Sequence, residues 1–236
     1  MDISKIYKSA KPKKPSIERK VSDTFVLQNF LVKKITPLLA HSLKKTNISA
    51  DLITIVSYLS IILSSTFFLI NVSYLGIIFL FLFGLLDSLD GDIARIKKAK
   101  TNHGETMDIF GADLFYFLIP FSISFFLYNQ KINTFFLIEE EIIIIGFFIS
   151  FLIVFKRMIG IRNYLLFINN TNLEKNKTKF KEKISLIKFF RYIYEHPIIR
   201  GNFFSEPGFI LNFSILIVFN FFQILYYYLI VIFVYH

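Results

Sequence analysis

Three aspartates beside two long apolar runs have the type and spacing of metal ligands. Asp87 and Asp90 end one run, and Asp108 opens the next. A spacing of three puts Asp87 and Asp90 on one helix face, and Asp108 could meet them where the two helices converge. Such carboxylates repel one another and raise each other's pKa unless a cation lies between them. Because the chain has no Cys and no clustered His, oxygen ligands favour Mg²⁺, Mn²⁺ or Ca²⁺ over Zn²⁺.

The residues between these carboxylates have the properties of a phosphate site. Gly91 and Ala94 are small enough for a substrate to approach the backbone closely, and Arg95 could pair with a phosphate as a planar fork. Metal ions held by carboxylates commonly bind phosphate oxygens and neutralise charge during phosphoryl transfer. The segment therefore predicts phosphoryl-transfer chemistry.

The same segment resembles the signature of the CDP-alcohol phosphotransferases. The matching pattern is Asp87-x-x-Asp90-Gly91-x-x-Ala94-Arg95, then eight residues, then Gly104-x-x-x-Asp108. A weaker likeness covers residues 48–54, which resemble the family's entry to its first membrane span. The resemblance implies a core of six transmembrane helices. It also implies an enzyme that moves a phospho-alcohol from a CDP-linked donor to an acceptor hydroxyl and releases CMP.

The resemblance further implies roles for single residues. It implies two Mg²⁺ or Mn²⁺ ions, with the ligands Asp87, Asp90 and Asp108. It places four residues at the CDP site, namely Asp87, Gly91, Ala94 and Arg95. The donor can be CDP-diacylglycerol or a CDP-linked small alcohol, because the motif contacts only the CDP that both share. Dimers are frequent in the family, so we expect a homodimer by analogy.

The family's fourth acidic residue, a metal ligand and the base on the acceptor hydroxyl, falls here on Ala112, and Asp113 stands next to it. In a regular helix five residues turn about 500°, so Asp113 would point roughly 140° away from Asp108. A one-residue π-bulge near Gly111 would turn Asp113 back, and such bulges are frequent at functional sites. We expect this bulge, which makes Asp113 a metal ligand and, with Asp108, a catalytic residue. The alternative, which the displacement of the fourth Asp to Asp113 favours, is a catalytically impaired family member, a pseudoenzyme or scaffold that keeps the nucleotide site.

Composition predicts that the elements carrying these residues are membrane helices. The chain has 236 residues, 54% of them hydrophobic, and a mean hydropathy of +0.56, which exceeds what one soluble core can bury. Runs of spanning length cover residues 52–70, 73–86, 107–128 and 135–155. Residues 208–235 form either a hairpin with Asn220 and Gln223 at its tip or one long tilted helix. We predict an all-α integral membrane bundle of about six transmembrane helices.

The distribution of positive charge predicts the orientation of this bundle. The net charge is +10; eleven of the 27 Lys and Arg residues precede Asp51, and eleven lie between Lys156 and Arg200. By the positive-inside rule the N-terminus and the active site face the cytoplasm in a multi-pass membrane protein. The predicted parts are a basic tail with an interfacial helix (1–51) and a transmembrane domain (52–236) containing a basic loop (about 156–207). A nucleic-acid partner would explain the charge but not the spans, so it is excluded.

Residues outside the motif allow less specific predictions. Apolar residues at helical spacing between Ser22 and Lys45, with Lys on the other face, predict an amphipathic helix in the membrane interface. It either packs under the bundle or contacts lipid or substrate. Asp92 lies off the motif pattern and is expected to be solvated. The basic residues after the fourth span either anchor it or bind an acceptor phosphate; they are Lys156, Arg157 and Arg162.

Overall fold

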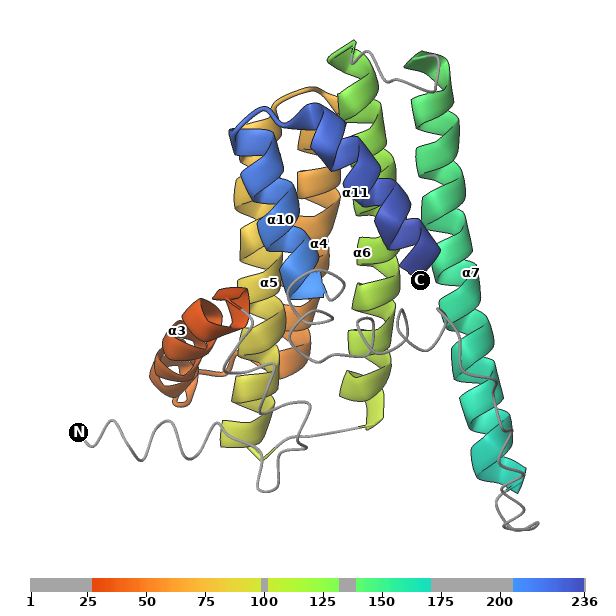
Figure 1. Ribbon diagram of the computed structural model, residues 1–236. Helices are drawn as coiled ribbons and strands as arrows, with labels where there is room; N and C mark the ends of the chain where they lie inside the picture. Colours follow the sequence, from red (N-terminus) through yellow and green to blue (C-terminus); the bar gives the residue numbers. More distant parts are fainter. Residues whose placement is uncertain (1–26, 99–101, 132–138, 171–205, 236) are drawn as a thin grey trace, which may run out of the picture.

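The computed structural model of the chain describes residues 27–98, 102–131, 139–170 and 206–235, and this part consists of helices joined by short turns and linkers (Figure 1). The helices are α3 (Leu27–Leu43), α4 (Ala50–Leu69), α5 (Ser73–Ile96), α6 (Asn102–Asn129), α7 (Glu139–Asn170), α10 (Glu206–Val218) and α11 (Phe222–Tyr235). The described residues contain no strand, which confirms the predicted all-α class. Most of the basic tail and of the predicted basic loop lies outside the described residues.

Several of these helices are long and apolar enough to cross a membrane. Within the described residues three segments meet both criteria: Ala50–Leu69, Thr106–Asn129 and Glu141–Ile159. α5 has 24 residues, about 36 Å at 1.5 Å each, and carries its charged residues in its last turns. α7 has 32 residues and continues to Asn170, through the first part of the segment expected to form the basic loop.

The C-terminal apolar run forms a hairpin, as one of the two sequence interpretations had it. α10 and α11 are separated by residues 219–221, where Asn220 adopts a positive φ of 56°. Asn212 Nδ2 donates to the Tyr228 hydroxyl at 2.9 Å, which ties the two helices together. With 13 and 14 residues, each helix is only about 20 Å long, shorter than the hydrocarbon core of roughly 30 Å. These two elements are therefore shorter than the full spans that were expected.

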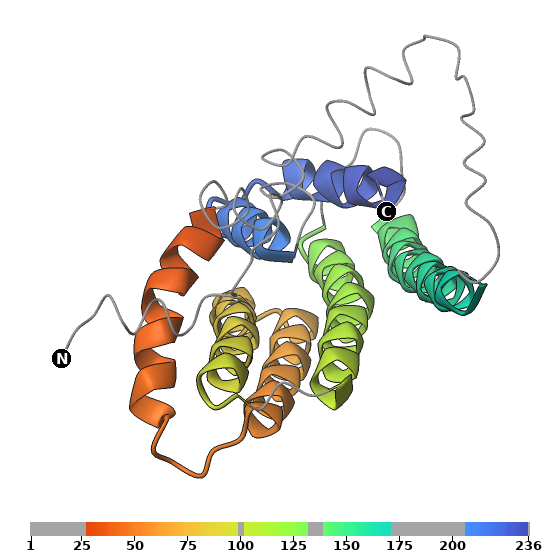
Figure 2. The same ribbon diagram turned by 90° about the horizontal axis from the view of Figure 1, so that it is seen from below.

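The motif helix α5 is held against α4. Ser49 caps α4 by accepting a hydrogen bond from the Leu52 N–H at 3.1 Å, and the helix ends at a turn where Asn71 has a φ of 64°. Near this turn the Ser64 hydroxyl donates to the Gly76 carbonyl of α5 at 2.7 Å. Seen along the bundle, α4 lies between α5 and α6 (Figure 2). Side chains of α4 can therefore reach the motif residues of both neighbours.

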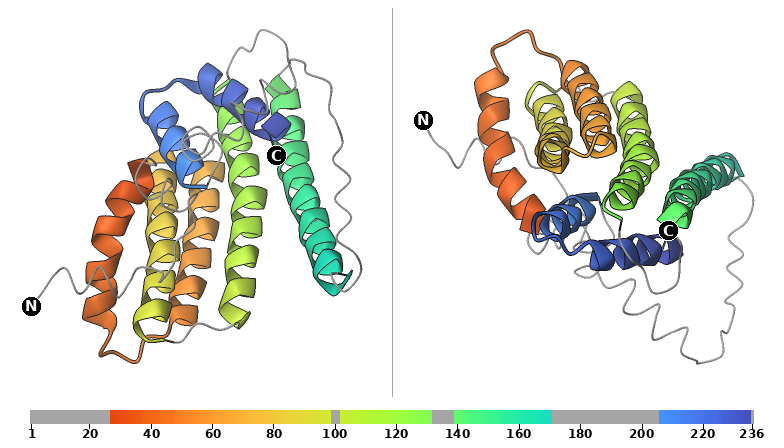
Figure 3. Two further views of the ribbon diagram at one scale, coloured as in Figure 1. Left: turned by 60° about the horizontal axis from the view of Figure 1, so that its bottom comes forward. Right: turned by 90° about the horizontal axis from the view of Figure 1, so that it is seen from above.

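α3 and α7 flank this three-helix row on opposite sides (Figure 3). The buried face of α3 repeats every four residues as Val32, Thr36 and Ala40 and packs on α5, while Ile35, Leu38 and Leu39 are exposed. Fully buried Phe side chains fill the centre of the bundle: Phe68, Phe83, Phe115 and Phe126. The described part of α3 thus packs against the bundle with one face and keeps a second apolar face on the outside.

The last turn of α5 is fastened to the linker between α3 and α4. Lys97 Nζ donates to the carbonyl oxygens of Thr46 and Ile48, each at 2.7 Å. Both carbonyls belong to residues after α3 and before α4, where the helical hydrogen-bond pattern is interrupted. This one side chain therefore connects the motif end of α5 to the segment that leads into α4.

Lys97→Met should lower the free energy of unfolding by about 1 kcal/mol, because methionine keeps the apolar stem and cannot donate to the two carbonyls. Unfolding of the purified protein in one detergent measures the change. The matched control is Lys98→Met, which alters the adjacent, exposed lysine. An equal loss of stability in both variants would contradict a specific role for Lys97.

Candidate functional site

The motif carboxylates lie at one end of the bundle, on two helices with α4 between them. Asp87 and Asp90 are in the last turns of α5, and Asp108 is in the second turn of α6. Asp90 is only 4% exposed, whereas Asp87 is half-buried and Asp108 is exposed. Asp90 is therefore the most buried member of the set, and Asp108 is the most accessible to solvent.

A hydroxyl of α4 holds Asp90 in place. Thr54 Oγ1 donates to Asp90 Oδ2 at 2.6 Å, and the same hydroxyl lies 3.1 Å from the carbonyl oxygen of Ala50. Thr54 closes the segment 48–54 that resembles the family's entry to the first span. The last residue of this segment therefore stabilises Asp90, because a buried carboxylate without a hydrogen-bond donor is energetically unfavourable.

The three carboxylates are electrostatically coupled but do not converge on one point. The negative charges of Asp87 and Asp108 both act on Asp90. Within the described ranges, no three acidic or His side chains lie close enough together to hold a metal ion. The arrangement is therefore a loose acidic cluster around one buried carboxylate.

Tyr58 lies beside this cluster and was missed by the sequence analysis. Its hydroxyl donates to the carbonyl oxygen of Met107, the residue before Asp108. Its ring occupies the space over Gly111, where an added Cβ would lie 2.8 Å from Tyr58 Cε1, and packs edge-on against Phe110. The available signal was the spacing from Thr54 to Tyr58, which puts both on one face of α4. Tyr58 thereby fixes the turn of α6 that carries Asp108 against α4.

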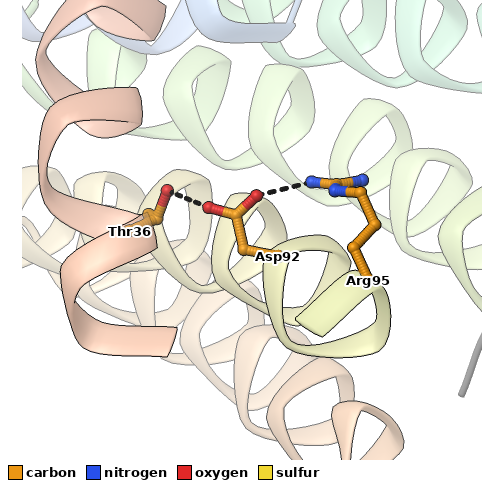
Figure 4. A network of polar contacts seen from close by, with 3 residues as sticks. All are labelled: Thr36, Asp92 and Arg95. Atoms are coloured by element: carbon orange, nitrogen blue, oxygen red, sulfur yellow. Dashed lines mark hydrogen bonds and ion pairs between the residues drawn. The ribbon is translucent and has the colours of Figure 1, made fainter. Parts of the chain in front are cut away.

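Asp92 is buried, so the expectation that it is solvated is wrong. It is 6% exposed, and both of its oxygens have partners (Figure 4). Arg95 Nη2 donates to Asp92 Oδ1 at 2.6 Å, and Thr36 Oγ1 of α3 donates to Asp92 Oδ2 at 2.7 Å. The motif pattern gave no signal for this, because it depends on α3 covering that side of α5.

The open side of Gly91 is covered by the Arg95 side chain. A Cβ at Gly91 would lie 3.3 Å from both Arg95 Nη1 and Nη2, so the guanidinium lies close to the bare glycine. Gly91 was expected to leave room for a substrate, and in this structure the space next to it holds Arg95. Ala94, on the same turn, is half-buried.

Asp113 faces α7 instead of the acidic cluster. α6 is a regular α-helix from residue 102 to residue 129, so the expected π-bulge near Gly111 is not formed. Arg157 Nε of α7 donates to Asp113 Oδ1 at 2.7 Å, and the guanidinium carbon lies 4.9 Å from the centre of the Tyr116 ring. Without the bulge, the helical repeat directs Asp108 and Asp113 toward different neighbours, and Ala112 stands at the family's fourth acidic position.

Comparison with known families agrees with this motif. The family model described as CDP-alcohol phosphatidyltransferase matches residues 47–234, which is most of the chain and nearly all of its described helices. This match confirms the resemblance found in the sequence. No curated protein matches the chain.

Tyr58→Phe should lower the free energy of unfolding by about 1 kcal/mol, since it removes the hydroxyl that binds the Met107 carbonyl and keeps the ring over Gly111. Unfolding in detergent measures this, with Tyr74→Phe as the control because Tyr74 is 69% exposed. If both variants unfold like the unmodified protein, the hydroxyl does not hold α4 to α6.

Proposed function

Because this chain belongs to the CDP-alcohol phosphatidyltransferase family, we propose that it transfers a phospho-alcohol from a CDP-linked donor to an acceptor hydroxyl and releases CMP. One observation carries the proposal. Asp90 is buried, is held by Thr54, and is acted on by the charges of two further carboxylates at the same end of the bundle. A buried carboxyl of this kind either takes up a proton or is stabilised as an anion by positive charge, which a bound cation would supply.

The chemistry of these carboxylates, though not their present spacing, suits a divalent cation, and the family generally depends on such metals. We assign Mg²⁺ or Mn²⁺ to Asp87, Asp90 and Asp108, all hard oxygen ligands. When bound, the ion would supply charge that neutralises the donor diphosphate. Asp87 and Asp108 are less buried than Asp90, and both would have to move toward Asp90 to share one ion with it.

The remaining steps use residues of this chain. We assign to Arg95 the pairing with a phosphate of the CDP moiety, through the guanidinium N–H groups that its bond to Asp92 leaves available. The acceptor oxygen forms a new bond to the phosphorus that stays with the alcohol, while the bond from that phosphorus to CMP breaks and CMP leaves with the electron pair. The hydroxyl proton passes to a carboxylate. We assign it to Asp108 rather than Asp113, because Asp113 is paired with Arg157 on the other side of α6.

The finer expectations about the setting are part of the same proposal. The donor is CDP-diacylglycerol or a CDP-linked small alcohol. The motif end of the bundle faces the cytoplasm, where the basic stretches 1–51 and 156–207 meet anionic headgroups. The chain acts as a multi-pass membrane protein and pairs with a second copy by family analogy.

A second candidate function is a nucleotide-binding protein without turnover. The observation that favours it is the Asp113–Arg157 ion pair, which occupies the acidic residue nearest to the family's fourth position while Ala112 stands at that position. Binding of CDP without CMP release from either donor class, at any Mg²⁺ or Mn²⁺ concentration, would select this candidate over the enzyme.

Asp90→Ala should abolish CMP release while leaving a folded protein, because it removes the one buried carboxylate of the cluster. CMP is measured after incubation of purified protein with Mg²⁺, CDP-diacylglycerol or CDP-linked small alcohols, and a panel of acceptors, and mass spectrometry identifies the product. Chelation of the metal should have the same effect on the unmodified protein. Asp51→Ala is the control, since Asp51 is an exposed carboxylate at the start of α4. If Asp90→Ala releases CMP at the rate of the unmodified protein, Asp90 does not belong to the active site.

Asp108→Asn should reduce turnover at least about 100-fold, the lower range for loss of a general base, whereas Asp113→Asn should keep most of it. The two variants make the same chemical change on one helix, five residues apart, so they control for each other. If Asp113→Asn lowers turnover as much as Asp108→Asn does, Asp113 would be the residue that accepts the hydroxyl proton. That role would require α6 to rearrange during the reaction.

A further inference from the structure

One buried acid at the motif end of the bundle has no part in the reaction proposed above. Asp92 is 6% exposed, and its two oxygens bind Arg95 of the motif and Thr36 of α3. We infer that Asp92 is a positioning residue that holds the Arg95 guanidinium at the nucleotide site and ties it to α3. The inference rests on the proposed role of Arg95 in binding a nucleoside diphosphate.

The Asp92–Arg95 contact is expected to persist when a ligand binds. If Arg95 swung away to a phosphate, Asp92 would be a buried carboxylate with Thr36 as its remaining donor in the network of Figure 4, and an uncompensated buried charge is strongly unfavourable. A guanidinium carries five N–H donors, so it can bind a carboxylate and a phosphate at once. Holding Arg95 is therefore a more stable arrangement than releasing it.

Gly91 confines the same guanidinium from a second side. Both terminal nitrogens of Arg95 lie 3.3 Å from the position that a Cβ on Gly91 would take. A side chain there would crowd the guanidinium, which would have to shift by a few tenths of an ångström. Because Gly91 has no side chain, the Arg95 guanidinium can pack against it. Asp92 holds the guanidinium in this position through the 2.6 Å contact between Asp92 Oδ1 and Arg95 Nη2.

Thr36 extends the network to the helix at the edge of the bundle. It lies on the buried face of α3 between Val32 and Ala40, and Ala40 packs with Ile93 in a small apolar cluster next to Asp92. The opposite face of α3 exposes apolar side chains suited to lipid. Docking of α3 on α5 therefore completes the set of donors that orients Asp92 and, through it, Arg95.

The first experiment measures CDP binding to the purified full-length protein by calorimetry and the donor KM and kcat for CMP release. Asp92→Asn should weaken CDP affinity and raise the donor KM about fivefold to tenfold, the range expected when one long side chain loses its preorganisation, with little change in kcat. Asp92→Glu should recover part of the affinity, because it restores a carboxylate. Thr36→Val should give a smaller loss, about twofold, and Thr66→Val, an exposed threonine bonded to its own helix, should give none.

A double-mutant cycle shows whether Asp92 acts through Arg95. In an Arg95→Gln background, Asp92→Asn should cause no further loss of CDP affinity. Additive losses would overturn the inference, because Asp92 would then act by another route. Tighter CDP binding by Asp92→Asn would also overturn it, since that result would mean that Asp92 competes with phosphate for the arginine.

The second experiment does not depend on the proposed function. Phenylglyoxal modifies accessible arginines, and mass spectrometry follows the rate at Arg95 without nucleotide. The rate should be several-fold higher in Asp92→Asn than in the unmodified protein and should stay low in Thr66→Val. If the unmodified protein binds no CDP, the proposed function fails while this measurement still tests the positioning role. Equal rates at Arg95 in Asp92→Asn and the unmodified protein would overturn that role.

Discussion

The arrangement of the site depends on the polar face of α4, which lies between the two helices that carry the motif. Thr54 donates to Asp90 of α5, and Tyr58 donates to the Met107 carbonyl of α6. When a helix is apolar on all sides, hydrophobic burial alone fixes neither its rotation about its own axis nor its position along that axis. Hydrogen bonds between neighbouring helices fix both. These two side chains therefore set how close the carboxylates of α5 come to Asp108.

Two buried aspartates two residues apart have opposite roles because their partners differ. Asp90 is bonded to a neutral hydroxyl and is acted on by the negative charges of Asp87 and Asp108. Within the described helices no basic side chain is recorded as balancing its charge, so it is suited to bind a cation. Asp92 is bonded to the guanidinium of Arg95 and to Thr36, so its charge is already balanced. Asp90 is therefore suited to bind a ligand directly, whereas Asp92 is suited to orient Arg95.

α6 separates its two acidic residues by the helical repeat. Asp108 belongs to the turn that Tyr58 holds against α4, while Asp113 pairs with Arg157 of α7, whose guanidinium also lies over the Tyr116 ring. A π-bulge would have joined them on one side, but the packing of Tyr58 over Gly111 is compatible with a regular helix there. The resulting ion pair between α6 and α7 keeps Asp113 away from the acidic cluster, so an active enzyme would have to use Asp108 as its base.

The sequence by itself determined the helical class, the positions of the long apolar helices and the family, because these follow from hydropathy and from motif residues at fixed spacing along one chain. It predicted that Asp87, Asp90 and Asp108 belong to one end of the bundle, but not that Thr54 and Tyr58 lie between them. The burial of Asp92 and the pairing of Asp113 were decided only by the tertiary structure. Both depend on which face of a helix meets α3 or α7, and contacts between segments more than forty residues apart leave no periodic signal in the sequence.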